Sequence, residues 1–137
     1  MDQVQAAVHF PGRLLLAEDD LLLAATLAEF LRDDGYHVTS ANDGAQALAA
    51  SRGLDFDVLL TDLRMPVMDG MALIRALRAE RPDLPVVVMS GDVPADWRSA
   101  IGPTQDGPGR LHLVKKPMSL SQLREALMAV WPTPVRA

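Results

Sequence analysis

Short apolar runs of strand length alternate with segments of helical periodicity along most of this chain. The strand-length runs cover residues 13–17, 37–41, 58–61, 86–89 and 111–115. Between the first two runs, Leu23, Leu27, Phe30 and Leu31 recur at the spacing of one helix face. This alternation is typical of a parallel β-sheet with helices on both faces. The sequence therefore predicts an α/β domain with five strands and five helices.

The predicted helices carry start and stop signals. Asp33-Asp34-Gly35 places a glycine where the first helix should end, and Asn42-Asp43-Gly44 offers a cap for an alanine-rich helix running to about Arg52. A third helix, near residues 70–81, carries Leu73, Ile74 and Leu77. Because of its prolines and glycines, segment 91–109 is expected to hold one short helix, around residues 94–101, followed by a loop.

The last helix is predicted from a capping box, Ser119-Leu120-Ser121-Gln122. Its inward face is expected to carry Leu120, Leu123, Leu127 and Val130. Prolines at 132 and 134 bar any continuation of this helix. We therefore expect one domain over residues 12–131, with tails at 1–11 and 132–137.

Composition limits the function classes. The 137 residues carry a net charge of -5, which argues against a domain that binds nucleic acid directly. The chain has no cysteine, so disulfides and thiolate metal sites are excluded. It has no apolar run of membrane-spanning length and no segment resembling a secretion signal. We expect a cytoplasmic protein without membrane contact.

Polar residues follow four of the predicted strands. The first strand leads into Glu18-Asp19-Asp20, the third into Asp62, the fourth into Ser90-Gly91-Asp92 and the fifth into Lys115-Lys116-Pro117. Ligand sites of open parallel sheets lie beyond the carboxyl ends of the strands. These carboxylates, a hydroxyl and an ammonium are therefore expected to meet at one edge.

Each of these residues also has a purely structural interpretation. Asp20 or Asp19 could cap the first helix, Ser90 could cap the fourth, and Asp62 could form an Asx-turn. Taken together, however, carboxylates that share a partly buried site repel one another unless a cation holds them. Oxygen ligands without cysteine indicate a hard cation, Mg²⁺ or Mn²⁺, whose usual partner is a phosphate.

Phosphate-binding glycine loops of the GxxxxGK[ST] and GxGxxG types are absent from the chain. Glu18 and Asp19 are better placed as metal ligands, which leaves Asp62 as a nucleophile toward phosphorus. Lys116 and Ser90 would then neutralise and hydrogen-bond the phosphoryl oxygens.

Four segments in this order resemble the receiver domain of two-component response regulators. They are residues 14–20 (LLLAEDD), 59–70 (LLTDLRMPVMDG), 87–91 (VVMSG) and 114–117 (VKKP). The similarity extends over roughly residues 12–131. It implies a flavodoxin-like, doubly wound five-stranded parallel sheet in strand order 2-1-3-4-5 with five helices, of which helix 4 is short or irregular here.

The resemblance also implies roles for individual residues. Asp62 would accept a phosphoryl group from a histidine kinase or a histidine phosphotransfer protein. Mg²⁺, or Mn²⁺, would be bound by Glu18, Asp19, Asp62 and the backbone carbonyl of Arg64, while Ser90 and Lys116 would contact the phosphoryl oxygens. Members of this family commonly have a cis bond at the position of Lys116-Pro117.

Two positions bear on how such a domain would signal. Family members carry an aromatic residue three positions before the lysine, and here that residue is Leu113; if Lys115 were the active lysine, it would be His112. Arg64 and Asp92 occupy the positions that tune hydrolysis of the phosphate. We hypothesise that Arg64 and Asp92 form an ion pair across the mouth of the site and prolong the lifetime of the phosphate. The alternative is that they are two solvated loop charges with little effect on each other.

The favoured function is a phosphoacceptor switch rather than an enzyme, either as a single-domain regulator or as the receiver of a hybrid histidine kinase. Its expected partners are the phosphohistidine donor and a downstream protein, and we expect a monomer or weak dimer. The alternatives are a pseudo-receiver that binds partners without phosphorylation and a Mg²⁺-dependent hydrolase.

Overall fold

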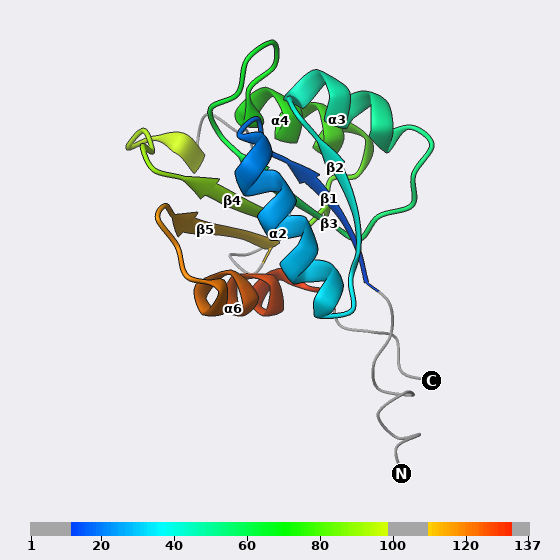
Figure 1. The fold of residues 1–137 in the computed structure, drawn as a ribbon. Coiled ribbons are helices and arrows are strands. Elements are labelled where there is room, and N and C mark those ends of the chain that lie inside the picture. Colours follow the sequence, from blue (N-terminus) through cyan, green and yellow to red (C-terminus); the bar gives the residue numbers. More distant parts are fainter. Residues whose placement is uncertain (1–11, 99–109, 133–137) are drawn as a thin grey trace.

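The computed structural model describes residues 12–98 and 110–132, which form a parallel β-sheet covered by helices (Figure 1). The sheet contains β1 (Arg13–Ala17), β2 (His37–Ala41), β3 (Val58–Asp62), β4 (Val86–Ser90) and β5 (Leu111–Lys115), in the order β2-β1-β3-β4-β5. Every neighbouring pair is parallel. The predicted fold class and strand order are confirmed. Strands β3 and β4 each continue one residue further than expected, so Asp62 and Ser90 are the last strand residues.

Four helices cover the sheet within the described residues: α2 (Leu21–Asp33), α3 (Gly44–Ser51), α4 (Gly70–Glu80) and α6 (Leu120–Val130). Figure 1 shows α2 and α6 on one face and α3 and α4 on the other. Successive strand residues alternate between the two cores. Leu14 and Leu16 pack with α2 and α6, whereas Leu15 and Ala17 pack with α3 and α4. Because helices cover both faces, the central strands β1, β3 and β4 are nearly continuous apolar runs, whereas the edge strands β2 and β5 contain exposed polar residues.

The caps of α2, α3 and α6 agree with the predicted signals, and the cap of α4 was not predicted. Asp20, Asp43 and Asp69 cap α2, α3 and α4, each accepting a hydrogen bond from a backbone N–H three residues later. The capping box of Ser119 and Gln122 is present at α6. Gly35, just after α2, has φ 104°, a conformation that a side chain would disfavour.

One predicted core position is wrong. Leu120, the first residue of α6, is 42% exposed. The inward stripe begins one turn later and consists of Leu123, Ala126, Leu127 and Val130, at the spacing of one helix face. Ala126 was missed because alanine carries little apolar signal of its own.

The helix expected around residues 94–101 is described only at its start. The backbone N–H of Trp97 donates to the Pro94 carbonyl at 3.1 Å, and Trp97 and Arg98 are helical. The rest of this segment lies outside the described residues, as do the expected tails apart from Pro132. None of the helices in the described part is both long and apolar enough to cross a membrane.

The loop between β3 and α4 is fixed at both ends by glycines. Gly70 donates its N–H to the Leu63 carbonyl at 2.9 Å, and Gly44 donates to the Met68 carbonyl at 3.0 Å. A Cβ atom at Gly70 would collide with the carbonyl oxygen of Asp62, and one at Gly44 with that of Met68. Glycine at these two positions therefore lets α4 and α3 approach the loop that follows Asp62.

Val67, in the middle of this loop, has φ 72°, which β-branched residues rarely adopt. The N–H of Met68 donates to the Pro66 carbonyl at 2.8 Å, so Val67 is the central residue of a γ-turn of the strained, positive-φ kind. Its side chain is 84% exposed. Little packing therefore compensates for the strain at this residue.

We expect Val67→Asn to raise the free energy of unfolding by about 1 kcal/mol, because asparagine tolerates positive φ and the valine loses few contacts. The midpoint of urea unfolding measures this change. Leu22→Asn is the control, since Leu22 is 79% exposed in the first turn of α2 and has no positive φ. A midpoint that does not rise in the Val67 variant would contradict the strain argument.

Candidate functional site

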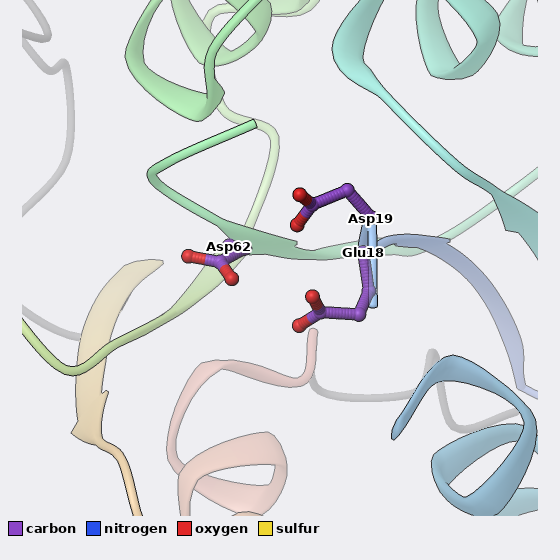
Figure 2. Close-up of side chains that lie close together, drawn as sticks. All are labelled: Glu18, Asp19 and Asp62. Carbon is purple, nitrogen blue, oxygen red and sulfur yellow. The ribbon is translucent and has the colours of Figure 1, made fainter. Parts of the chain in front are cut away.

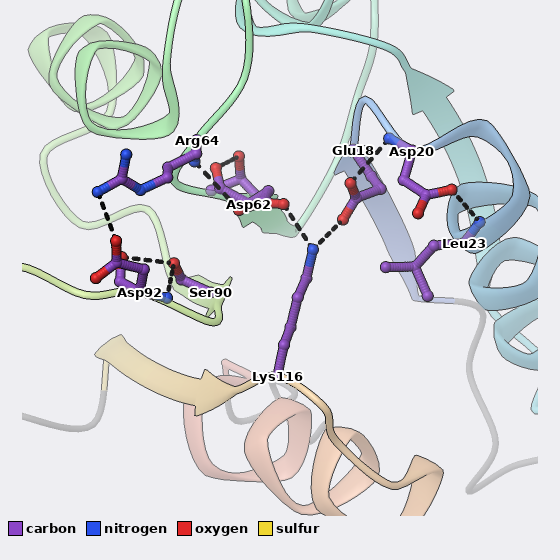
Figure 3. Close-up of polar contacts among 9 residues, drawn as sticks. Glu18, Asp20, Leu23, Asp62, Arg64, Ser90, Asp92 and Lys116 are labelled. Carbon is purple, nitrogen blue, oxygen red and sulfur yellow. Dashed lines mark hydrogen bonds and ion pairs between the residues drawn. The ribbon is translucent and has the colours of Figure 1, made fainter.

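The polar residues that follow the strands meet at one edge of the sheet (Figure 3). Glu18 comes directly after β1, Asp62 ends β3, Ser90 ends β4 and Lys116 comes directly after β5. Glu18, Asp62 and Ser90 are buried. The parallel register of the sheet therefore brings together groups that are far apart in the chain, as the sequence predicted.

Lys116 joins the two buried carboxylates. Its Nζ donates to Glu18 Oε1 at 2.9 Å and to Asp62 Oδ2 at 2.6 Å. Desolvation lowers the pKa of Lys116, but the hydrogen bonds and charges of Asp62 and Glu18 together outweigh it and raise that pKa above its ordinary value. The two carboxylates therefore favour the charged, ammonium form of Lys116.

Glu18 is the most deeply buried of the acids. Desolvation raises its pKa, the nearby charge of Asp62 raises it further, and hydrogen bonds from the Asp20 N–H and Lys116 act against both. The Asp20 N–H donates to Glu18 Oε2 at 3.0 Å. One ammonium thus only partly offsets the cost of holding this carboxylate charged beside a second one.

Asp19 completes a group of three carboxylates. One oxygen from each of Glu18, Asp19 and Asp62 lies within 4.8 Å of the others, and Figure 2 shows the three side chains close together. Three clustered carboxylate oxygens with part of the group exposed fit a hard cation that keeps some of its water. The donor set therefore suits Mg²⁺ or Mn²⁺.

Asp20 belongs to the helix rather than to this group. Its Oδ1 accepts the Leu23 N–H at 3.1 Å as the cap of α2. This answers the question of which aspartate caps the helix, and it leaves Asp19 available as a ligand.

The two oxygens of Asp62 make different contacts, one with the backbone and one with Lys116. Oδ1 accepts the Arg64 N–H at 3.1 Å, which is the Asx-turn considered from the sequence. Oδ2 faces Lys116. The backbone N–H donors of Arg64 and Asp20 were not predicted from the sequence. Every residue except proline has a backbone N–H, so the residue type does not show which of them bind a carboxylate.

Ser90 is at the edge of the sheet, but its hydroxyl bonds locally. Oγ donates to the Asp92 carbonyl at 3.2 Å and accepts the Asp92 N–H at 3.3 Å. Its contact with phosphoryl oxygens remains a prediction, as does a metal contact from the Arg64 carbonyl. The bridge expected between Arg64 and Asp92 is present, with Nη2 2.9 Å from Oδ2, and both side chains are largely exposed.

The two lysines differ in their surroundings. Lys115 is exposed, whereas Lys116 reaches the acids and its backbone N–H donates to the Ser90 carbonyl at 2.9 Å. The Lys116-Pro117 bond is cis, as the resemblance implied. With Lys116 as the site lysine, the position of the family aromatic falls on Leu113, which is half-buried.

The structure is thus an α/β domain whose five-stranded parallel sheet carries three acids and one lysine at its carboxyl edge. Residues 14–128 match the sequence model of the response regulator receiver domain. The chain belongs to this family, whose members are signalling domains rather than enzymes of the usual kind.

Similar proteins agree with the family match. The response regulator receiver protein CpdR of Brucella abortus is 37% identical over 111 residues, covering 81% of this chain and 89% of CpdR. The structure of the chemotaxis protein CheY4 of Vibrio cholerae has a TM-score of 0.77 and 25% identity, with 88% and 99% coverage.

A third similar structure is that of the response regulator TrrA of Thermotoga maritima in complex with Mg²⁺-BeF. It has a TM-score of 0.73 and 21% identity, with 87% and 98% coverage, and at this identity it supports the fold alone. Several other relatives, including transcriptional regulatory proteins, are longer, and the chain spans half or less of their length.

We expect Mg²⁺ to stabilise the protein against unfolding, because the ion binds the three carboxylates only when they are brought together. At a concentration one hundred times its Kd, the gain is about 2.7 kcal/mol. Asp19→Asn removes one ligand and should abolish most of the gain, measured as the shift of Tm with Mg²⁺ concentration.

Asp20→Asn is the matched control. This variant replaces the neighbouring carboxylate by an amide, as Asp19→Asn does at its own position. Asparagine is as good a helix cap as aspartate, so α2 should keep its cap. A Tm response to Mg²⁺ that survives in the Asp19 variant, or is lost in the Asp20 variant, would contradict the assigned ligands.

Proposed function

We propose that this protein is a phosphoacceptor whose Asp62 receives a phosphoryl group from a phosphohistidine donor in the presence of Mg²⁺. The observation that carries the proposal is the position of Asp62: it lies 2.6 Å from the ammonium of Lys116 and within 4.8 Å of the oxygens of Glu18 and Asp19. A carboxylate held among these charged groups at the carboxyl edge of the sheet is suited to act as a nucleophile toward phosphorus.

The residues of this chain have separate roles in the transfer. Asp62 attacks phosphorus, and its Oδ1 is oriented by the Arg64 N–H. Lys116 neutralises an equatorial phosphoryl oxygen once the ammonium shifts from the carboxylates toward it. Ser90 reaches the phosphoryl group after its hydroxyl leaves the Asp92 backbone.

The metal would be held by Glu18, Asp19 and Asp62, with the Arg64 carbonyl as a further ligand. When bound, Mg²⁺ neutralises charge on the acids and on the phosphoryl oxygens. This chemistry fits a site in which three carboxylates share one ammonium.

The donor is a histidine kinase or a histidine phosphotransfer protein, and the phosphorylated form binds a downstream protein. Because Leu113 stands where relatives carry an aromatic residue, output does not depend on the burial of a ring at this position. The protein acts as a single-domain regulator or as the receiver of a hybrid kinase, as a monomer or weak dimer in the cytoplasm.

Incubation with acetyl phosphate and Mg²⁺ is expected to add the mass of one phosphoryl group, and Asp62→Asn is expected to prevent it. Intact-mass spectrometry measures both. No adduct would favour a pseudo-receiver that binds partners without phosphorylation, and multiple turnover without an adduct would favour a hydrolase. The complete set of Glu18, Asp19, Asp62, Ser90 and Lys116 supports the phosphoacceptor over both alternatives.

The bridge between Arg64 and Asp92 is proposed to slow water attack on the phosphorylated aspartate. Its side chains are 68% and 77% exposed, so its contribution is at most about 1 kcal/mol. Arg64→Ala is therefore expected to shorten the phosphate half-life by up to about fivefold.

Loss of radiolabel from the isolated phosphoprotein measures the half-life. Asp92→Asn should have a similar effect, since it breaks the same ion pair, and Arg52→Ala should have none because Arg52 is exposed at the end of α3. An unchanged half-life in the Arg64 variant would contradict this proposal and would show that the ion pair does not affect hydrolysis of the phosphate.

A further inference from the structure

Asp92, in the loop after β4, is held by both Ser90 and Arg64 (Figure 3). Its backbone N–H donates to Ser90 Oγ at 3.3 Å, and its backbone carbonyl accepts from the same hydroxyl at 3.2 Å. Its carboxylate pairs with Arg64, with Nη2 2.9 Å from Oδ2. The N–H of Arg64 in turn donates to Asp62 Oδ1 at 3.1 Å. Both residues that hold Asp92 therefore belong to the site around Asp62.

These contacts cannot all persist once Asp62 carries a phosphoryl group. A serine hydroxyl has a single proton, which Ser90 can donate to the Asp92 carbonyl or to a phosphoryl oxygen but not to both. Phosphorylation also converts the Asp62 carboxylate into an uncharged acyl group, which is a weaker acceptor for the Arg64 N–H. The positions of both residues that hold Asp92 are therefore loosened.

Trp97 lies at the other end of the same loop. Its side chain is 8% exposed and belongs to the core between the sheet and helices α3 and α4. The N–H of Trp97 donates to the Pro94 carbonyl at 3.1 Å, so residues 94–97 form one turn. Only Val93 separates this turn from Asp92, and Val93 packs against the same core. A shift of Asp92 is therefore passed along a short piece of chain to the ring.

The loop has space in which to shift. A pocket of about 510 Å³ lies between the loops after β3 and β4, and its lining includes Arg64 on one side and Asp92 and Pro94 on the other. The present position of Asp92 depends on two long hydrogen bonds and one largely exposed ion pair, each of which contributes little free energy. A modest change at the site is therefore enough to displace the loop.

Arg98 reduces the cost of exposing the Trp97 ring. Its Cζ lies 4.8 Å from the ring centroid, and Arg98 itself is exposed. Because the two residues are adjacent in the chain, the guanidinium can stay over the ring when the ring turns outward. The cation–π contact is then kept in the exposed state.

We propose that the contacts of Asp92 with Ser90 and Arg64 keep Trp97 in the core, and that phosphorylation of Asp62 breaks these contacts and exposes the ring. The inference rests on the proposed function, because the phosphoryl group supplies the signal. It places the responsive ring in the loop after β4, while the position of the family aromatic is occupied by Leu113. An exposed tryptophan gives the phosphorylated form an anchor for a downstream protein, since tryptophan contributes strongly to protein interfaces.

Acrylamide quenching of tryptophan fluorescence measures the exposure of the ring. The chain contains two tryptophans, so the measurement uses a Trp131→Phe background in which only Trp97 remains. Beryllofluoride with Mg²⁺ is the probe that takes the place of the phosphoryl group, and a rise in Tm reports its binding. The quenching constant of Trp97 should rise severalfold when the probe binds, because a buried ring becomes accessible to acrylamide.

Asp92→Ala should raise the quenching constant without any probe, because it removes the ion pair with Arg64. Ser90→Ala removes the two hydrogen bonds to the backbone of Asp92 and should have the same effect. Asp96→Ala is the matched control: Asp96 is exposed in the same loop, next to Trp97, and this variant keeps all the contacts of Asp92. Its quenching constant should equal that of the parent chain.

The outcomes separate this inference from the proposed function. If the probe raises Tm but leaves the quenching constant unchanged, the ring does not respond and only this inference fails. If Asp92→Ala and Asp96→Ala give the same quenching constant, Asp92 does not hold the ring and the inference is also overturned. If the probe does not bind and acetyl phosphate gives no adduct, the phosphoacceptor function fails together with it.

A second measurement covers the case in which Trp131→Phe does not fold. Fluorine NMR of the wild-type chain labelled with fluorotryptophan follows the two rings as separate signals. One of the two signals should move toward the chemical shift of a solvent-exposed ring when the probe binds. Two unmoved signals in the presence of bound probe would contradict the exposure of Trp97.

Discussion

The contact of one ammonium with two buried carboxylates is the interaction on which this site depends. Lys116 lies within hydrogen-bonding distance of both Glu18 and Asp62, and Asp19 brings a third carboxylate to the same place. Removing a charge from water costs several kcal/mol unless it is paired. With three acids and one ammonium in the group, the pairing of charges is incomplete, and the excess negative charge makes the site suited to a cation.

The architecture of the sheet holds this incompletely compensated group in place. β3 and β4 are buried along their whole length, Asp62 is the last residue of β3, and Glu18 directly follows the largely buried β1. Gly70 brings the start of α4 against the backbone of Asp62, which fixes the following loop. The backbone therefore holds the carboxylates close together. They cannot move apart into solvent, although their negative charges repel one another.

Much of this arrangement could be predicted from the sequence. Apolar runs show where strands lie, and a parallel sheet requires their carboxyl ends to meet, so the grouping of Glu18, Asp62 and Lys116 follows from pattern alone. Two helix caps were predictable for a different reason, because Asp43 and Ser119 belong to local capping sequences.

Other features depend on tertiary packing and could not be predicted. The inward face of α6 depends on how the helix lies on the sheet, which is why Leu120 was misjudged and Ala126 was missed. The bonding of the Ser90 hydroxyl with Asp92 is a choice among rotamers that residue types do not determine. The positive φ of Val67 is imposed by the loop closure and contradicts the preference of valine itself.

The order in which the site residues occur along the chain has a consequence for biosynthesis. Glu18 and Lys116 are 98 positions apart, and Asp62 and Lys116 are 54 apart. A ribosome must therefore release nearly the entire domain before the acids acquire their positive partner. A nascent chain that ends before β5 therefore carries Glu18 and Asp62 without the ammonium that pairs with them.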